Sequence, residues 1–310
     1  MPDISIILTV YNGINYLDKS VTSVLQQDYK DFEFLILDNC STDDTWKYLQ
    51  LVKDDRIKLY RNEKTQGVFF NLNFLIRKTT SPLIKLWAHD DIMYPYCLQT
   101  IVAFHLKHPE IGFSYSDRDI IDANGVIRNL DFIDNTPEIV TPDLHARIAF
   151  FTGSIAGNIS NVCLNKKALY KVGLFNEEMQ ISADFDMWVR LAKDHDTGFI
   201  SRKLIKLRDH EGQLSRKENF YIYHVKEDLR VYRNLLSYVN PQIRKEGKLL
   251  LKNYKLVFYY TLMVKALMQG KLKTAHSFYK ELCSMDNFLS LSIAFIKAKI
   301  LKPAKPEFLK

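Results

Sequence analysis

The sequence predicts an α/β protein in which a mainly parallel sheet carries helices on both faces. Short apolar runs alternate with amphipathic helical patterns in the first half of the chain, as in strands joined by crossover helices. The runs are nearly continuous rather than alternating, which indicates strands that are buried on both faces. Beyond residue 215 only helical periodicity remains. We therefore expect two domains, an α/β domain at residues 1–215 and an all-helical extension at residues 216–310.

The individual elements follow from the same patterns. Apolar, β-rich runs predict strands at residues 4–10, 32–37, 57–60, 83–87, 113–116, 120–122, 162–164 and 198–207. Apolar residues three and four positions apart predict helices at 14–25, 41–51, 71–77, 94–107, 166–173, 184–193, 221–239, 241–268, 272–282 and 288–301. Pro142 starts a further helix, and Asn124-Gly125 is a strong hairpin signal.

Composition limits the class of protein. The chain has 310 residues, of which 47% are hydrophobic and 25% charged, as in ordinary globular proteins. The start Met1-Pro2-Asp3 does not resemble a signal peptide, and apolar runs such as 257–264 are shorter than the roughly 20 residues that span a bilayer. Four scattered cysteines form no Cys-x-x-Cys pair, which favours reduced thiols. We therefore expect a cytoplasmic protein.

Positive charge is concentrated in the helical extension. The whole chain has a net charge of +7, whereas residues 216–310 contain 19 basic and 7 acidic residues and so carry +12. A basic extension of this kind suggests an anionic surface as its partner. No motif of DNA- or RNA-binding proteins accompanies it, so we expect no nucleic-acid partner.

Polar residues gather where the first four predicted strands end. They are Thr9, Tyr11 and Asn12, then Asp38, then Gly67, Asn71 and Asn73, and finally His89, Asp90 and Asp91. Open α/β sheets bind their ligands at the carboxyl ends of the strands. A carboxylate or amide there can bond a base or a ribose, and an aromatic ring can stack on the base. The Gly-x-Gly-x-x-Gly and P-loop motifs are both absent from the sequence, which excludes two other common nucleotide sites.

The adjacent carboxylates of Asp90 and Asp91 form the most informative of these groups. Two neighbouring anions repel each other, so the pair favours a bound cation or a strong hydrogen-bond donor. The alternative is that one of the two caps the next helix, with Pro95 in its first turn.

These motifs resemble those of the inverting family-2 glycosyltransferases of the GT-A fold. The resemblance covers about residues 4–215 and depends on residues 7–12, 37–43, 90–91 and 184–188, with Arg190. It implies a Rossmann-like, mixed and mainly parallel sheet. It also implies an enzyme that moves a hexosyl or N-acetylhexosaminyl group from a nucleotide-sugar donor, expected to be UDP-linked. The acceptor would be a hydroxyl of a growing surface glycan, such as a capsule or a lipopolysaccharide, and we expect this glycan to be lipid-linked.

The resemblance also assigns roles to residues. Thr9, Tyr11 and Asp38 would hold the base and the ribose, and the nucleotide sugar would also contact Asn12, Gly67, Asn71, Asn73 and His89. Asp90 would bind a divalent metal, Mn²⁺ or Mg²⁺, on the diphosphate. His210, which Ser215 follows in the sequence, would be a second contact to this metal. Asp184 would be the general base for a single, inverting displacement. Asp186 and Trp188 would line the acceptor pocket, with a place in the core as the alternative for Trp188.

Two positions depart from the family pattern. Ala88 stands where the family commonly has the first metal-binding Asp, and Ala183 where it has a Glu before the base. The loss of an anionic ligand weakens metal binding, because Mg²⁺ and Mn²⁺ prefer oxygen donors. Two rival functions therefore stay open, a catalytically silent nucleotide-sugar-binding protein and a sugar nucleotidyltransferase. A sugar nucleotidyltransferase would require a Gly-rich basic loop after the first strand, which residues 11–15 do not provide.

The last predicted helix combines apolar and basic residues. Its stripe consists of Leu289, Ile293, Ile296 and Ile300, and it is accompanied by Lys297, Lys299, Lys302 and Lys305. A helix of this kind can lie on an anionic membrane, which would make the protein peripheral on the inner face of the cell membrane. The alternative is a helical bundle that packs on the first domain, or on a second subunit in a homo-oligomer.

Overall fold

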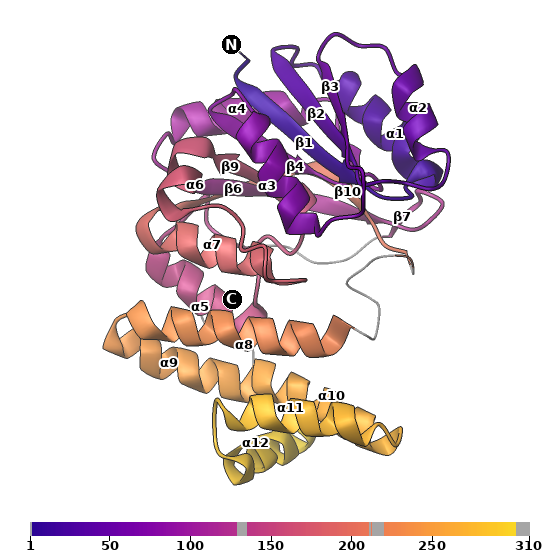
Figure 1. Ribbon diagram of the computed structural model, residues 1–310. Helices are drawn as coiled ribbons and strands as arrows, with labels where there is room; N and C mark the ends of the chain where they lie inside the picture. Colours follow the sequence, from indigo (N-terminus) through magenta and orange to yellow (C-terminus); the bar gives the residue numbers. More distant parts are fainter. Residues whose placement is uncertain (1, 129–134, 211, 213–219, 302–310) are drawn as a thin grey trace. The chain divides into compact units, whose positions relative to one another are not determined.

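Parallel pairing of the first strands determines where the ends of these strands lie (Figure 1). In the computed structural model, which describes residues 2–128, 135–210, 212 and 220–301, β1 (Ile4–Val10) lies between β2 (Phe32–Asp38) and β4 (Leu83–Trp87) and runs parallel to both. β3 (Ile57–Arg61) extends the sheet beyond β2, again in parallel. All four carboxyl ends therefore meet at one edge of the sheet.

The rest of the sheet is mixed. Its strand order over the described residues is β3-β2-β1-β4-β9-β6-β10-β5, with β7 on β6 and β8 on β10. The additional strands are β5 (Ile92–Met93), β6 (Phe113–Ile121), β7 (Ile127–Arg128), β8 (Ile139–Val140), β9 (Val162–Asn165) and β10 (Thr197–Arg208). The long pairing of β6 with β10 is parallel, and β9 joins β4 to β6 in antiparallel fashion. The predicted fold class is therefore confirmed.

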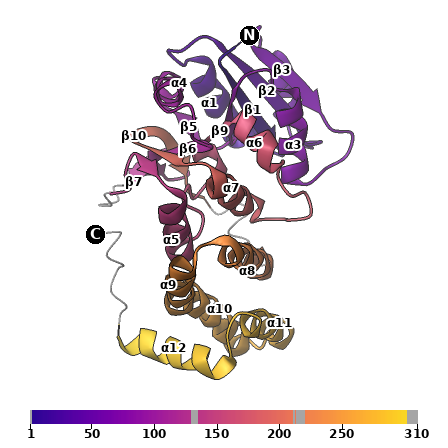
Figure 2. The ribbon, with the colours of Figure 1, turned by 90° about the vertical axis from the view of Figure 1, so that its left-hand side faces the viewer.

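Helices cover both faces of the parallel strands. The helices of this part are α1 (Ile14–Leu25), α2 (Thr45–Leu51), α3 (Val68–Lys78), α4 (Cys97–Lys107) and α6 (Lys166–Val172), with the short η1 (Ile159–Asn161). Leu17, Val21 and Val24 of α1 share one core with the even-numbered residues of β1. α3 packs against β1 and β2, and Figure 2 shows it on the face opposite to α1. The strands are consequently buried on both sides, as their apolar composition requires.

A second compact unit is helical over its described residues. It comprises Pro142–Ile155, Ile181–Val189 and Leu214–Lys310, whereas the sheet unit comprises Met1–Thr141, Ala156–Gln180 and Arg190–Gln213. Its helices are α5 (Pro142–Thr152), the first half of α7 (Ala183–Asp194), α8 (Tyr221–Tyr238), α9 (Pro241–Leu251), the π-helical η4 (Lys252–Leu256), α10 (Val257–Met268), α11 (Leu272–Cys283) and α12 (Phe288–Ile300). No helix of the described segments is long and apolar enough to cross a membrane. The division into domains 1–215 and 216–310 stays a prediction.

The structure differs from the sequence pattern at five elements. The strands predicted at 113–116 and 120–122 are one strand, β6, because its polar middle is paired: Asp119 accepts a hydrogen bond of 2.6 Å from Lys203 of β10. The helix predicted at 94–107 begins only at Cys97, after the unpredicted β5, since Pro95 disfavours a helical Tyr94. β8 has only two residues and gives no pattern. The helix predicted at 241–268 contains the π-helical η4, which apolar periodicity does not reveal.

Candidate functional site

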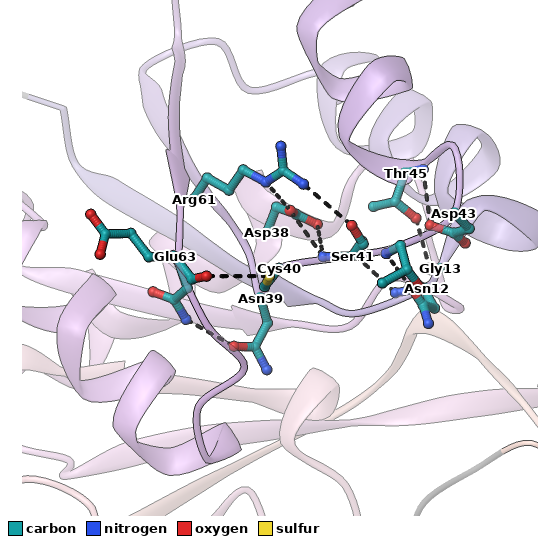
Figure 3. Close-up of polar contacts among 12 residues, drawn as sticks. Asn12, Gly13, Asp38, Asn39, Cys40, Ser41, Asp43, Thr45, Arg61 and Glu63 are labelled. Carbon is teal, nitrogen blue, oxygen red and sulfur yellow. Dashed lines mark hydrogen bonds and ion pairs between the residues drawn. The ribbon is translucent and has the colours of Figure 1, made fainter.

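The loops that follow β1 and β2 are tied together by hydrogen bonds (Figure 3). The backbone N–H of Asn12 donates to Ser41 Oγ, and that of Gly13 to Thr45 Oγ1, each at 2.9 Å. In return, Asn12 Oδ1 accepts a hydrogen bond of 2.8 Å from the Thr42 N–H. These bonds fix the backbone directly after Tyr11, whose side chain remains 47% exposed at the edge of the sheet. An aromatic ring held in this way can stack on a base.

Both loops contain a non-glycine residue in the left-handed region of backbone space. Asn12 has φ of 50° and Cys40 has φ of 62°. Asn tolerates this conformation, whereas other L-residues adopt it at a cost of roughly 1–2 kcal/mol. Strained backbone of this kind is typical of functional loops, and here it occurs after both of the first two strands.

Asp38 is fully buried beneath an arginine that the sequence analysis did not identify. Its Oδ2 forms an ion pair of 3.1 Å with Arg61 Nε and accepts a bond of 3.2 Å from the Ser41 N–H. The Arg61 guanidinium also lies over the ring of Trp46, 4.8 Å from its centroid. Because Asp38 has no exposed surface, the group that a ligand meets at the end of β2 is the partly exposed Arg61. The signal that could have shown this is the position of Arg61 at the end of the third predicted strand.

An amide network joins the ends of β2 and β3 to α3. Asn39 Oδ1 accepts bonds of 2.8 Å from Asn62 Nδ2 and from the Gln66 N–H, and Asn62 Nδ2 also donates to Asn71 Oδ1 at 2.8 Å. Asn71 is buried and therefore acts as part of the scaffold. Gly67 is exposed at the start of α3, with φ of −63° that any residue can adopt.

Asn73 is not brought to this edge. Its Nδ2 donates to the Phe175 carbonyl at 2.9 Å and to Glu177 Oε1 at 2.8 Å, and its Oδ1 accepts from the Phe175 N–H at 3.0 Å. The buried amide of Asn73 therefore holds α3 to the segment before α7.

At the end of β4, Asp90 contacts His210, which follows β10. Asp90 Oδ2 lies 3.0 Å from His210 Nε2, and the Gly212 N–H donates to His210 Nδ1 at 3.2 Å. With Nδ1 as an acceptor, the proton is assigned to Nε2, which then donates to Asp90. The ring of Tyr16 lies 5.1 Å from that of His210. Ser215 lies outside the described residues.

The side chains of Asp90 and His210 can hold a divalent cation only together with a substrate. The described parts of the chain contain no group of three or more His, Cys, Asp or Glu side chains suited to a metal. Asp90 and His210 supply one carboxylate and one imidazole, with side chains that are 13% and 16% exposed. Mg²⁺ is often bound by one or two carboxylates plus substrate phosphates and water, and imidazole is also a ligand for transition metals. The two residues therefore fit a metal that a diphosphate helps to hold, with His210 Nε2 giving up the proton that it shares with Asp90 when the metal binds.

His89 and Asp91 lie on either side of Asp90. Burial lowers the pKa of His89, so its imidazole is neutral near pH 7. Asp91 is buried and accepts a hydrogen bond of 2.9 Å from the Arg208 N–H, while Arg208 Nε donates to the Asp90 carbonyl at 2.8 Å. Asp91 thus fixes β10 against the end of β4. It does not cap α4, whose N-cap residue is Tyr96.

Asp184 belongs to the helical unit, in the first turn of α7. Its Oδ1 accepts a bond of 2.7 Å from the Phe185 N–H. Burial, with a smaller contribution from the negative charge of Asp228, raises the pKa of Asp184 to about 7. Trp188, two residues beyond Asp186, is fully buried, which favours its alternative assignment to the core.

Comparison with known proteins identifies the family of the chain. The family description "Glycosyl transferase family 2" matches residues 5–172, more than half of the chain. An uncharacterised glycosyltransferase of Rickettsia conorii is 29% identical over 219 residues, which are 69% of this chain and 35% of that protein. The chain spans about a third of the length of the first relatives that it matches.

One relative and one solved structure carry more specific names. The UDP-Glc:alpha-D-GlcNAc-diphosphoundecaprenol beta-1,3-glucosyltransferase WfgD of Escherichia coli is 33% identical over 125 residues, 40% of this chain and 49% of that protein. The crystal structure of S. aureus TarS 1-349 in complex with UDP-GlcNAc has a TM-score of 0.71 and 14% identity, and the match covers 96% of this chain and 92% of that one. At this level of identity the likeness shows the fold alone.

The close approach of the first loop to β4 makes a specific prediction. A Cβ added to Gly13 would lie 2.5 Å from His89 Cδ2 and 2.6 Å from Val10 Cγ2. We expect Gly13→Ala to lower the free energy of unfolding by about 1–3 kcal/mol, because both neighbours are packed. Urea unfolding would measure this change. The matched control is Gly67→Ser, where an added Cβ meets nothing within 4 Å and Ser is a good helix cap. An equal effect of the two substitutions would contradict the prediction.

Proposed function

We propose that the chain, which belongs to glycosyl transferase family 2, moves a sugar from a UDP-linked donor to a hydroxyl of a growing surface glycan. It is a glycosyltransferase. The UDP donor and a lipid-linked acceptor are suggested by what WfgD is named for, and a UDP-sugar also occurs in the TarS structure. The observation that carries the proposal is the meeting of Tyr11, Asp38 and Asp90 at the ends of three parallel, adjacent strands.

The ends of β1 and β2 are proposed to bind the nucleoside. Tyr11 is exposed and can stack on the base, with Thr9 and Asn12 beside it. Asp38 is proposed to act mainly through Arg61, whose guanidinium it holds at the edge. Planar guanidinium groups bind phosphate and carbonyl oxygens well, so Arg61 joins the residues proposed for donor binding.

The end of β4 is proposed to bind the diphosphate. A divalent metal, held by Asp90 and His210, would stabilise the negative charge of the leaving nucleoside diphosphate. His89 remains neutral beside this pair, so it can accept or donate a hydrogen bond without adding charge.

Asp184 is proposed to be the general base that takes the proton of the acceptor hydroxyl. A base works best when its pKa is near the working pH, and the pKa of Asp184 is raised to about 7. A single base without a nucleophile on the opposite face of the sugar gives one displacement, and therefore inversion. Asp186 is placed in the acceptor pocket as part of the same proposal.

The function can be tested in two steps. A panel of nucleotide sugars, including UDP-glucose and UDP-N-acetylglucosamine, is screened for an increase in melting temperature, since a bound ligand stabilises the fold. UDP release is then measured with and without a lipid-linked sugar diphosphate. We expect Asp184→Asn to keep the donor-induced shift and to lose about a hundredfold or more of the transfer rate.

Three other results would contradict this account. Donor binding without turnover in the wild-type protein would support the silent binding protein suggested by Ala88 and Ala183. Release of pyrophosphate from a nucleoside triphosphate and a sugar phosphate would support a nucleotidyltransferase. Near-normal transfer by Asp184→Asn would move the base to another residue, with Asp186 the first to examine.

A second prediction concerns the metal. We expect Asp90→Ala to weaken nucleotide-sugar binding strongly in Mn²⁺ and little in the presence of a chelator, because the carboxylate acts through the cation. Binding can be followed by calorimetry under both conditions. Gln66→Ala, at the same edge but remote from Asp90 in the hydrogen-bond network, is the control and should respond equally with and without metal. If the wild-type protein keeps full activity in chelator, no metal is needed, and basic side chains such as His210 and Arg61 would instead stabilise the leaving diphosphate.

The last helix is proposed to attach the protein to the cytoplasmic face of a membrane. Leu291 and Ala294 of α12 are buried, whereas Leu289, Ile293, Ile296 and Ile300 are between 46% and 75% exposed. Lys297 and Lys299 are exposed beside them; Lys302 and Lys305 lie outside the described residues. The sides of α12 therefore differ, and the outer one has the apolar and basic composition of a helix that lies among lipid headgroups.

Vesicle flotation tests this attachment with the full-length chain. We expect flotation with phosphatidylglycerol vesicles, less of it at high salt, because each lysine near an anionic surface contributes about 1 kcal/mol. Ile296→Asp with Ile300→Asp should abolish flotation. Leu249→Asp, at an exposed apolar residue of α9, should not. If wild type fails to float and light scattering shows a dimer that the double variant loses, the outer side of α12 contacts a second copy instead.

A further inference from the structure

Two consecutive carboxylates of α8 lie against the start of α7. Glu227 is 8% exposed, and its Oε2 accepts hydrogen bonds from the backbone N–H groups of Ile181 at 3.0 Å and of Ser182 at 2.9 Å. These two residues form the turn that immediately precedes α7 (Ala183–Asp194). All of these residues belong to the helical unit.

This arrangement fixes the helix turn that carries Asp184. The N–H groups at the beginning of a helix have no partner within the helix, and a negative charge at this end is favoured by the helix dipole. Glu227 supplies both the acceptor and the charge from a different helix. The backbone position of Asp184, one residue beyond Ala183, therefore depends on α8.

Asp228 adds charge to the same region. The Tyr259 hydroxyl of α10 donates a hydrogen bond of 2.6 Å to Asp228 Oδ2. Burial is the main cause of the raised pKa of Asp184, and the negative charges of Asp228 and Glu227 raise it further. The pKa of Asp228 is itself raised by burial, although the bond from Tyr259 acts against this.

The other titratable groups around Asp228 are of both kinds, and the charges of two basic neighbours lower the pKa of Asp228. They are His224 and Tyr232 on α8, Lys255 on η4, and Tyr259 on α10, with Glu227 beside them. Burial lowers the pKa of Lys255, although the charge of Asp228 acts in the opposite direction. Burial raises the pKa of Tyr232 and Tyr259 well above the ordinary value, so both phenols stay neutral. The charges that act on Asp184 itself are those of Asp228 and Glu227, and both raise its pKa beyond the effect of burial.

We propose that Glu227 and Asp228 are positioning residues for catalysis, in which Glu227 fixes the place of Asp184 and Asp228, held by Tyr259, sets the charge around it. The inference rests on the proposed role of Asp184 as the base. It makes the carboxyl-terminal helices a part of the catalytic apparatus, in addition to any role in attachment.

The pH profile of kcat/KM tests the contribution of Asp228. We expect Asp228→Asn to move the acid limb of the profile to lower pH by about half a pH unit or more. The reason is that removal of a nearby negative charge lowers the pKa of Asp184. Tyr259→Phe should shift the acid limb in the same direction but by less. Without the hydrogen bond from Tyr259, Asp228 holds its proton more tightly and so carries less negative charge near Asp184. This second variant keeps the test decisive if Asp228→Asn does not fold. The control is Asp286→Asn, whose carboxylate pairs with Lys252 in the same unit.

Thermal unfolding gives a readout that needs no substrate. Burial raises the pKa of Asp184 to about 7 in the folded protein, so its contribution to stability is present below the unfolded value near pH 4 and is lost as pH rises through about 7. Burial raises the pKa of Asp228 as well, so the stability that it contributes is also lost as the pH rises. We expect the fall in melting temperature between pH 5 and pH 8 to be smaller in Asp228→Asn than in wild type. In Asp286→Asn the fall should be unchanged, because hydrogen bonds from Lys252 and Asn287 overcome burial and lower the pKa of Asp286.

Glu227 is tested by separating kcat from KM. Glu227→Ala should lower kcat by about tenfold or more through displacement of Asp184, with the KM for the donor unchanged. Glu227→Gln keeps an acceptor oxygen and should recover most of that loss. Equal damage by Ala and Gln, or a loss confined to KM, would contradict a positioning role.

The outcomes separate this inference from the proposed function. If Asp184→Asn is inactive while Asp228→Asn and Tyr259→Phe keep the wild-type acid limb and the wild-type temperature slope, the base assignment stands and the role of Asp228 is overturned. If Asp184→Asn retains turnover, the base assignment fails and the inference fails with it.

Discussion

The position of β1 between two parallel partners is the constraint on which the rest of the structure depends. The pairing register places Val10 opposite Asp38 and Leu8 opposite Trp87. Every residue that follows one of these strands must therefore leave the sheet at the same edge. The loops cannot drift apart there, because Asn12 and Gly13 donate their backbone N–H groups to the side chains of Ser41 and Thr45. The loops of the candidate site are thus fixed by the same strands that bury the core.

Most of the fold could be predicted because buried parallel strands and amphipathic helices leave strong local patterns. The strands at 4–10 and 83–87 were predicted with their observed bounds. The failures occur where a distant partner decides the local structure. β6 stays extended through Asp117, Arg118 and Asp119 because β10 pairs with it along that length. Likewise, the two-residue strands β5 and β8 exist only through their pairing with β10.

The candidate site could be predicted in its positions but not in its contacts. Strand ends identified Tyr11, Asp38 and Asp90, since the carboxyl edge of a parallel sheet is a general binding position. Arg61 was not identified, because its position at the end of the third predicted strand does not by itself show that it pairs with Asp38. Asn73 was included on type alone, and its amide is used by Phe175 and Glu177. Polar type therefore marks candidates, whereas hydrogen-bond partners decide between binding and scaffold.

The charged residues of the two units differ in how their charge is balanced, and this difference suits two kinds of chemistry. At the strand edge, Asp38 faces Arg61 and Asp90 faces His210, so each carboxylate has a cationic or proton-donating partner. Asp184 instead is buried near Asp228 and Glu227, and its burial, with a smaller contribution from these two negative charges, raises its pKa to about 7. A carboxylate with a partner stays available as an anion for a metal or a donor group, whereas one among other carboxylates holds a proton more readily near neutral pH. Two roles for one residue type can thus arise from environment alone. On this argument, α8 matters to the proposed reaction because Glu227 and Asp228 add negative charge to the burial that already raises the pKa of Asp184, whereas α10 contributes the Tyr259 hydroxyl that holds Asp228.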